Sequence, residues 1–190
     1  LPAMADHLKW DDLLRKDRFR PSPKDSIDHR SEFERDYDRV VFSSSFRRLQ
    51  DKTQVWPLET HDFVRTRLTH SCEAAVIGRS LVRGVYGELK DRVSFKEDDA
   101  AGAVATACLL HDIGNPPFGH TGEEHIGSWF TKLFQNEKPE MTQQERLDLC
   151  AFEGNAHALR VATCLQTLGR PYGMNLTFGT LATLMKYPWS

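Results

Sequence analysis

The segment HDIGNPPFGH, residues 111–120, closes a long apolar run, AAGAVATACLLHDIG, residues 100–114. A helix that is apolar on every side is one that the rest of its domain surrounds, so this run predicts a buried helix. Asp98 or Asp99 is expected to cap its start, and Gly114 with the double proline is expected to end it. The prolines also fix the turn that follows, and the glycines let the backbone approach a neighbour closely.

An adjacent histidine and aspartate, His111 and Asp112, fall at the end of this predicted helix. Burying a carboxylate is costly unless it is paired or bound to a metal. Imidazole nitrogen and carboxylate oxygen together suit Mn, Fe, Co, Ni or Zn, and tolerate Mg when water completes the coordination. The alternative is a solvated helix end, which the apolar helix before the pair and the rigid turn after it disfavour.

His70 lies in RTRLTH, at the start of another predicted helix. Taken alone it is a helix-start histidine beside a basic patch, but together with residues 111–120 it is the natural second imidazole of a metal site. Arg65 and Arg67 beside it could hold phosphate with two hydrogen bonds each. They could equally lie at a solvated helix end.

After the turn come His120, Glu123 and Glu124. Positions three and four apart share one face of a helix. A carboxylate there would hold the imidazole in one orientation and favour its protonated form, as a general acid requires. The alternative is an ordinary helix N-terminus with favourable acids in its first turn.

Helical signals dominate the rest of the chain, and the fold class we predict is all-α. Capping boxes at Ser31/Glu34 and Thr142/Glu145 each start a helix. The other predicted helices cover residues 7–16, 43–50, 67–86 and 121–135, and a last helical stretch reaches Gly169. In the helix over 67–86, Ala74, Ile77, Leu81 and Val85 share one apolar face. Residues 1–30 are expected to be an N-terminal arm, of which 1–3 are a tag scar, ahead of a domain over 31–190.

The composition bounds the class of protein. The chain has 190 residues, enough for one domain, and a formal net charge of -2, so no global basic field attracts nucleic acid. No apolar run approaches the roughly 18 residues of a membrane span. None of the four cysteines forms a CxxC pair. We therefore expect reduced core cysteines and a cytoplasmic protein.

Several segments resemble the HD superfamily of phosphohydrolases, and most closely its bacterial dGTP triphosphohydrolases. They are RRLQDKTQVWPLE (47–59), VRTRLTHS (64–71), LLHDIGNPPFGHTGE (109–123) and FEGNA (152–156), with a weaker match in LMKYPW (184–189). The resemblance covers most of the chain from about Ser31 onward. It implies an HD-domain helical bundle and hydrolysis of dGTP to deoxyguanosine and tripolyphosphate.

The resemblance also implies a role for individual residues. His70, His111 and Asp112 would bind one divalent metal ion, Mg or Mn first and other transition metals as alternatives. His120 would protonate the leaving group with support from Glu123. Substrate contacts would come from Gln54 to the deoxyribose or base, and from Arg67, Asn155, Lys186 and Tyr187 to the triphosphate. The family's fourth metal ligand, a downstream aspartate, is expected beyond Ser190, so the chain is expected to be the N-terminal portion of a longer enzyme with an incomplete bundle.

Two alternatives remain open at this point. One is a relative that accepts several dNTPs or other nucleotides, and the other is a nonenzymatic regulator that binds nucleotide or single-stranded DNA. The resemblance further implies a homo-oligomer and a single-stranded DNA effector. We also expect apolar surface such as Ala101–Leu110 to stay partly uncovered in a domain of this length.

Overall fold

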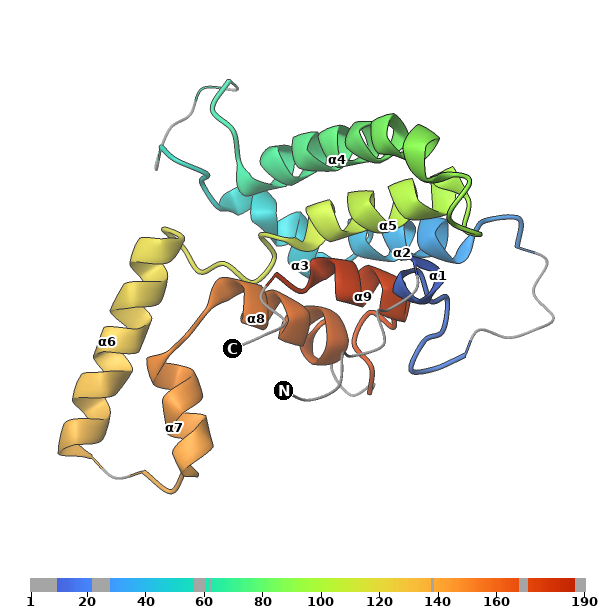
Figure 1. Ribbon diagram of the computed structural model, residues 1–190. Coiled ribbons are helices and arrows are strands. Elements are labelled where there is room, and N and C mark those ends of the chain that lie inside the picture. Colours follow the sequence, from blue (N-terminus) through green and yellow to red (C-terminus); the bar gives the residue numbers. More distant parts are fainter. Residues whose placement is uncertain are drawn as a thin grey trace, which may run out of the picture.

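In the computed structural model of the chain, the described residues are 10–21, 28–56, 61, 63–137, 139–167 and 171–186. These residues form helices and no β-strand beyond two isolated bridge pairs, which confirms the all-α prediction (Figure 1). Within these segments, no helix combines the length and apolar character needed to cross a membrane. The elements are α1 (Trp10–Leu13), α2 (Glu32–Val41), α3 (Ser44–Arg47), η1 (Arg48–Asp51), α4 (Arg67–Leu89), α5 (Glu97–Leu110), α6 (His120–Asn136), α7 (Gln143–Cys150), α8 (Gly154–Arg160), η2 (Val161–Leu165, a π-helical turn) and α9 (Phe178–Leu184).

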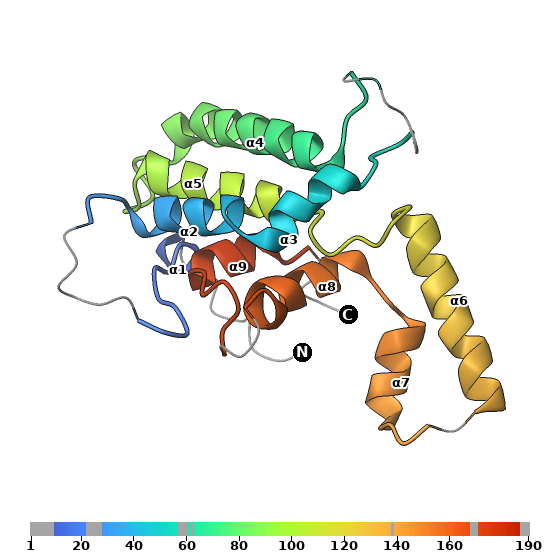
Figure 2. The same ribbon diagram turned by 180° about the vertical axis from the view of Figure 1, so that it is seen from behind.

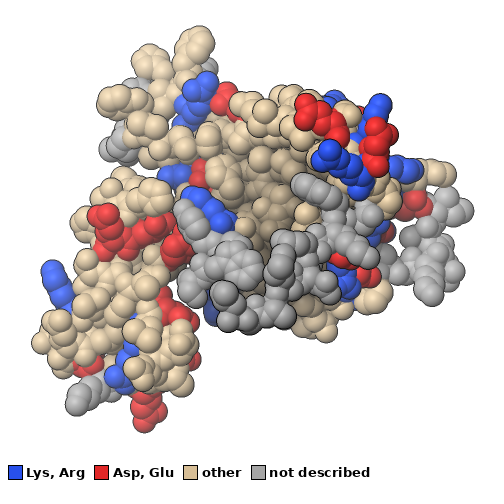
Figure 3. All heavy atoms as spheres, in the orientation of Figure 1, with Lys and Arg blue, Asp and Glu red and all other residues tan. Residues whose placement is uncertain are grey.

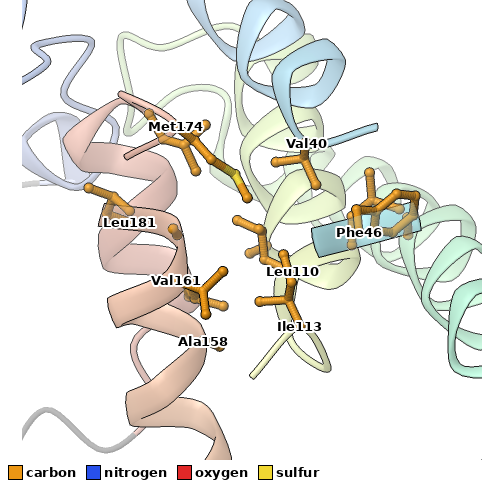
Figure 4. Close-up of a cluster of buried hydrophobic side chains, with 14 of the residues drawn as sticks. Val40, Phe46, Leu110, Ile113, Ala158, Val161, Met174 and Leu181 are labelled. Carbon is orange, nitrogen blue, oxygen red and sulfur yellow. The ribbon is translucent and has the colours of Figure 1, made fainter. Parts of the chain in front are cut away.

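The apolar helix α5 lies at the centre of the body, packed against α4, α2 and α9 (Figures 1 and 2). Ala101 is 2% exposed, and Leu109 and Leu110 are fully buried, so the expectation that Ala101–Leu110 stays uncovered is wrong. The reason is that α2 and α9, far apart in sequence, close over it. Figure 4 shows part of this core, made by Val40, Phe46, Leu110, Ile113, Ala158, Val161, Met174 and Leu181.

The start of α5 differs from the prediction. Lys96 precedes the first helical residue, and no side chain caps the helix. Asp99, one of the two expected caps, is instead buried within the helix and pairs with Lys16 Nζ at 2.8 Å. Both capping boxes, by contrast, are present as predicted, at Ser31/Glu34 before α2 and at Thr142/Glu145 before α7.

The buried face of α4 is not the one that its apolar residues suggest. Ile77, Leu81 and Val85 are 60%, 65% and 52% exposed, whereas Ala75 and Gly78 face the core. Small residues occupy the buried face because α5 lies too close for larger side chains. A Cβ added to Gly78 would be 2.9 Å from Cys108 Sγ. The larger apolar side chains Ile77, Leu81 and Val85 therefore lie on the outer surface of α4.

The basic segment after α1 packs into the body. Arg18 is buried, pairs with Asp36 of α2, and donates to Glu32 at 2.7 Å. Asp36 in turn accepts hydrogen bonds at 2.7 and 2.8 Å from the hydroxyls of Thr177 and Thr180, at the start of α9. One buried ion pair therefore joins the N-terminal segment, α2 and α9.

The four cysteines are free, as expected, but only Cys108 packs against the core, and none is fully buried. Cys72 and Cys164 are exposed, and Cys108 and Cys150 are half-buried. Helices present cysteines to any face, so a helical position alone does not predict burial.

The helices α6 and α7 form a hairpin that projects from the body (Figures 1 and 2). The hairpin begins at His120, directly after the HDIGNPPFGH turn, and the chain returns to the body through Glu153 at the start of α8. Both ends of the projecting hairpin therefore lie at the C-terminal end of α5.

Candidate metal centre

Three predicted ligands come together where α4 and α5 meet. His70 lies in the first turn of α4, and His111 and Asp112 lie in the turn after α5. One ligand atom from each of the three side chains lies within 4.8 Å of the others, so the group could hold a metal ion. They line a hollow of about 420 Å³.

The start of α4, which carries His70, is fixed by backbone pairing with the segment after η1. The Arg67 amide donates to the Lys52 carbonyl at 2.9 Å, and Thr53 and Thr66 form a bridge pair. Thr66 then caps the helix by accepting from the Thr69 amide. The first turn of α4 is therefore held beside the end of α5.

A hydrogen bond selects the nitrogen that His111 can offer. Its Nδ1 lies 2.6 Å from the Cys108 carbonyl, which can only accept, so Nδ1 carries the proton. The neutral ring then has its free electron pair on Nε2, and that nitrogen is the available ligand atom. The His70 ring lies beside it, with 5.2 Å between the two ring centroids.

Asp112 offers one buried oxygen that accepts no hydrogen bond from the described residues. Its Oδ1 accepts from Asn115 Nδ2 at 2.6 Å. Its Oδ2 lies 3.0 Å from Arg67 Nη1, at ion-pair distance but without hydrogen-bond geometry. This carboxylate and the imidazoles of His70 and His111 form a donor set that fits a divalent cation.

His120 lines the same hollow but is supported differently from the three ligands. Its Nδ1 lies 3.0 Å from Glu123 Oε2, and its side chain is 88% exposed. The other oxygen of Glu123 accepts from the Gly154 amide at 3.0 Å. Acidic side chains gather around the first turns of α6 on this face (Figure 3). The geometry thus holds His120 by Nδ1, and Nε2 is left as the nitrogen that can act on a bound molecule.

Of the residues predicted to contact substrate, some line the hollow and others lie outside it. Gln54 and Arg67 line the hollow, and Gln54 Oε1 is buried without a hydrogen-bond partner among the described residues. Asn155 and Lys186 do not line it. Asn155 donates to Glu153, the N-cap of α8. Tyr187 lies outside the described residues.

Asn155 and Lys186 both interact with the carboxylate of Glu153, the first through a hydrogen bond and the second through its charge. Burial alone raises the pKa of Glu153. The hydrogen bonds from Ala156 and Asn155 and the charge of Lys186 outweigh burial, and they hold this pKa below its usual value. The carboxylate is therefore the charged N-cap of α8, and the two residues predicted to contact triphosphate lie beside it.

Two supporting residues were missed from the sequence, Asn115 and Lys52. The Asn115 amide holds Asp112, and its carbonyl accepts from Lys52 Nζ at 2.8 Å. Burial, followed by the charges of Arg67 and Arg48, lowers the pKa of Lys52. Asn115 could have been found from its place three residues after Asp112, whereas nothing in the sequence marks Lys52.

Two imidazoles and one carboxylate thus converge in a helical body, where α4 begins and α5 ends, as a group that could hold a metal ion. Residues 67–153, which contain all three ligands, match the HD domain family. The chain therefore carries an HD domain over these residues.

Curated relatives match almost the whole chain. A deoxyguanosinetriphosphate triphosphohydrolase-like protein of Listeria innocua is 48% identical over 96% of this chain and 43% of its own length. The protein of the same name from Pseudomonas aeruginosa is 45% identical, over 96% of this chain and 42% of its own length. A deoxyguanosinetriphosphate triphosphohydrolase of Enterobacter sp. is 37% identical, over 82% of this chain and 36% of its own length. The chain thus spans less than half the length of these relatives.

Proposed function

We propose that the chain carries the metal-binding part of a phosphohydrolase that converts dGTP to deoxyguanosine and tripolyphosphate. The observation that carries the proposal is the convergence of His70, His111 and Asp112 in one hollow that His120 also lines. The names of the relatives support dGTP as the first substrate to test.

The three ligands and the basic side chain beside them suit a phosphate ester. A divalent cation, Mn²⁺ or Mg²⁺, would supply Lewis acidity there, which activates water and offsets negative charge on phosphoryl oxygens. Arg67 lines the hollow and would bind phosphate oxygens through its planar guanidinium. Gln54 Oε1, a buried acceptor without a partner among the described residues, would take a hydrogen bond from a sugar hydroxyl or from the base.

His120 would act on the leaving group. In this reaction a bond forms between water oxygen and the α-phosphorus, and the bond from that phosphorus to the sugar 5′-oxygen breaks. The 5′-oxygen leaves as an alkoxide unless it gains a proton, which His120 would donate from Nε2. Glu123 holds the opposite nitrogen at 3.0 Å, so the ring keeps its orientation during the transfer.

Product analysis tests the proposal. The full-length protein, incubated with Mn²⁺ and dGTP, should release deoxyguanosine and tripolyphosphate, read by chromatography and ³¹P NMR. Formation of dGMP and pyrophosphate would show that the bond between the α- and β-phosphates is broken, not the bond to the sugar 5′-oxygen, and would contradict the proposal. Binding of dGTP without any turnover would favour a nonenzymatic regulator.

The same assay decides base selectivity. The rates on dATP, dCTP and dTTP are compared with the rate on dGTP under identical conditions. A preference for dGTP above about tenfold, or about 1.4 kcal/mol of barrier, supports a dGTP enzyme. Similar rates on all four would support the broader dNTP hydrolase.

A further inference from the structure

Gly154, the first residue of α8, lies between two side chains that support different parts of the candidate site. A Cβ added there would be 2.2 Å from Asn115 Oδ1 and 2.5 Å from Glu123 Oε1. Real Cβ atoms do not come this close, so both side chains occupy space that only glycine leaves open. The Gly154 amide also donates to Glu123 Oε1 at 3.0 Å.

Each of these two side chains contacts one residue of the candidate site, either the metal ligand Asp112 or the proton donor His120. Asn115 Nδ2 donates to Asp112 Oδ1 at 2.6 Å and so fixes the orientation of the carboxylate beside His111. Glu123 Oε2 lies 3.0 Å from His120 Nδ1. A continuous path of contacts therefore runs from Asp112 through Asn115, Gly154 and Glu123 to His120.

We propose that Gly154 is a positioning residue that sets Asp112 and His120 at the same time, through Asn115 and through Glu123. This inference rests on the proposed function for the roles of Asp112 and His120. The bare Cα of Gly154 lets the supports of the metal ligand and of the proton donor meet at one point. Any side chain at position 154 displaces both supports together.

The contacts separate this role from a general need for glycine in the backbone. The third atom nearest to the added Cβ is Asn115 Cγ at 3.3 Å, so the three nearest atoms all belong to side chains. Gly114 is different, because a Cβ there would lie 2.2 Å from the Ala158 backbone nitrogen. Alanine at position 154 should therefore fold, and intrinsic helix propensity favours it over glycine.

Three variants and one control test the proposal on the 190-residue chain. Gly154→Ala perturbs both supports, Asn115→Ala removes only the Asp112 support, and Glu123→Gln weakens only the His120 support. Gly84→Ala on α4 is the matched control, because its added Cβ has no atom within 4 Å. Mn²⁺ affinity is measured by calorimetry, and NMR of ¹⁵N-labelled histidine reads which nitrogen of His120 carries the proton.

The expected pattern links two readouts through one residue. Gly154→Ala and Asn115→Ala should each weaken Mn²⁺ binding at least about tenfold, the usual loss for a residue that orients a ligand. Gly154→Ala and Glu123→Gln should each shift the His120 proton away from Nδ1. Glu123→Gln should leave Mn²⁺ affinity within about threefold, and Gly84→Ala should change neither readout. His125, whose Nδ1 lies 2.7 Å from the Thr121 carbonyl, serves as the internal reference in the spectra.

A double variant strengthens the test. In the Asn115→Ala background the Oδ1 atom is gone, so Gly154→Ala should cost no further Mn²⁺ affinity, within about twofold. Full additivity of the two losses would overturn the proposal, and so would a Gly154→Ala chain that matches Gly84→Ala in both readouts. Failure of Gly154→Ala to fold would also overturn it, because the contacts would then not be confined to side chains.

The proposed function can fail separately. If the unaltered full-length protein binds no Mn²⁺, the proposed function is contradicted, while the His120 spectra of Gly154→Ala and Glu123→Gln still decide the positioning role.

Discussion

Arg67 Nη1 lies 3.0 Å from Asp112 Oδ2, and the two side chains are 8% and 7% exposed. The candidate metal ligand thus has a buried cationic neighbour from the chain itself. Removing one member of such a pair leaves an uncompensated buried charge, which is strongly destabilising.

The first prediction follows from this ion pair. Arg67→Ala should lower the free energy of unfolding of the chain in EDTA by about 3 kcal/mol, because Asp112 loses its neighbouring charge. Saturating Mn²⁺ should recover part of the loss, since a bound cation compensates the same carboxylate. Urea denaturation with EDTA and with Mn²⁺ measures both. The control is Arg65→Ala, whose exposed pair with Glu73 should contribute less than about 1 kcal/mol. Equal losses for the two variants would contradict the prediction.

The second prediction separates metal binding from proton donation. Asp112→Ala and His111→Ala should abolish Mn²⁺ binding and turnover together, since each removes a ligand. His120→Ala should keep Mn²⁺ affinity, because His120 is outside the three-residue group, and lose about 10²–10⁴-fold in turnover. Calorimetry and dGTP turnover by the full-length protein measure the two effects. Loss of Mn²⁺ binding in His120→Ala would assign His120 to the metal instead.

The third prediction concerns acid. The pKa of Glu153 lies below its usual 4.5 in the folded chain, so its charge stabilises the fold above that value. The contribution is lost as the pH falls through the lowered pKa. Glu153→Gln should therefore be less stable at pH 7 by about 0.5 kcal/mol, the usual size for a charge at a helix N-terminus. The difference from the unaltered chain should vanish at low pH. A difference that stays constant from pH 7 to pH 3, or one that the exposed Glu88→Gln reproduces, would count against it.

The fourth prediction tests the outer surface of α4. Leu81 is 65% exposed and Leu109 is fully buried, although both are leucines in long helices. Leu109→Ala should cost about 2–5 kcal/mol, whereas Leu81→Ala should cost about 0.5 kcal/mol or less. Denaturation of the two variants under identical conditions measures the contrast. Comparable losses of stability for the two variants would mean that Leu81 is buried in solution, and would contradict the prediction.

Most helices were readable from the sequence because they carry a local signal, but α9 was not among those predicted. The capping boxes at Ser31 and Thr142 and the apolar run of α5 depend only on neighbouring residues, and the structure places them as predicted. The inner face of α4 was wrong because burial there depends on how closely α5 approaches. Only the packed pair of helices shows that Gly78 and Ala75 are buried against α5 while Ile77 and Leu81 are exposed.

In the candidate site, too, contacts between sequence neighbours could be predicted and contacts between distant segments could not. The pairs formed within the HDIGNPPFGH turn and the first turn of α6, such as His120 with Glu123, follow from spacing. Contacts over long sequence separations do not: Lys52 reaches the Asn115 carbonyl across 63 positions, and Gly154 reaches Glu123 across 31. The distribution of Asn155 and Lys186 around Glu153 likewise depends on a cap that spacing alone does not reveal.

The projecting hairpin of α6 and α7 acts as a lever with its short end at the site. The first residue of α6 is His120. Where the chain returns after α7, the Gly154 amide donates a hydrogen bond to Glu123 of α6. At 1.5 Å per residue, the 17 residues of α6 give it an arm of about 25 Å. A sideways push of about 2 Å at the tip then rotates the base by about 5°, which moves a side chain near the pivot by only tenths of an ångström. Movement far from the hollow is thus scaled down, before it reaches His120, to the small displacements on which proton transfer depends.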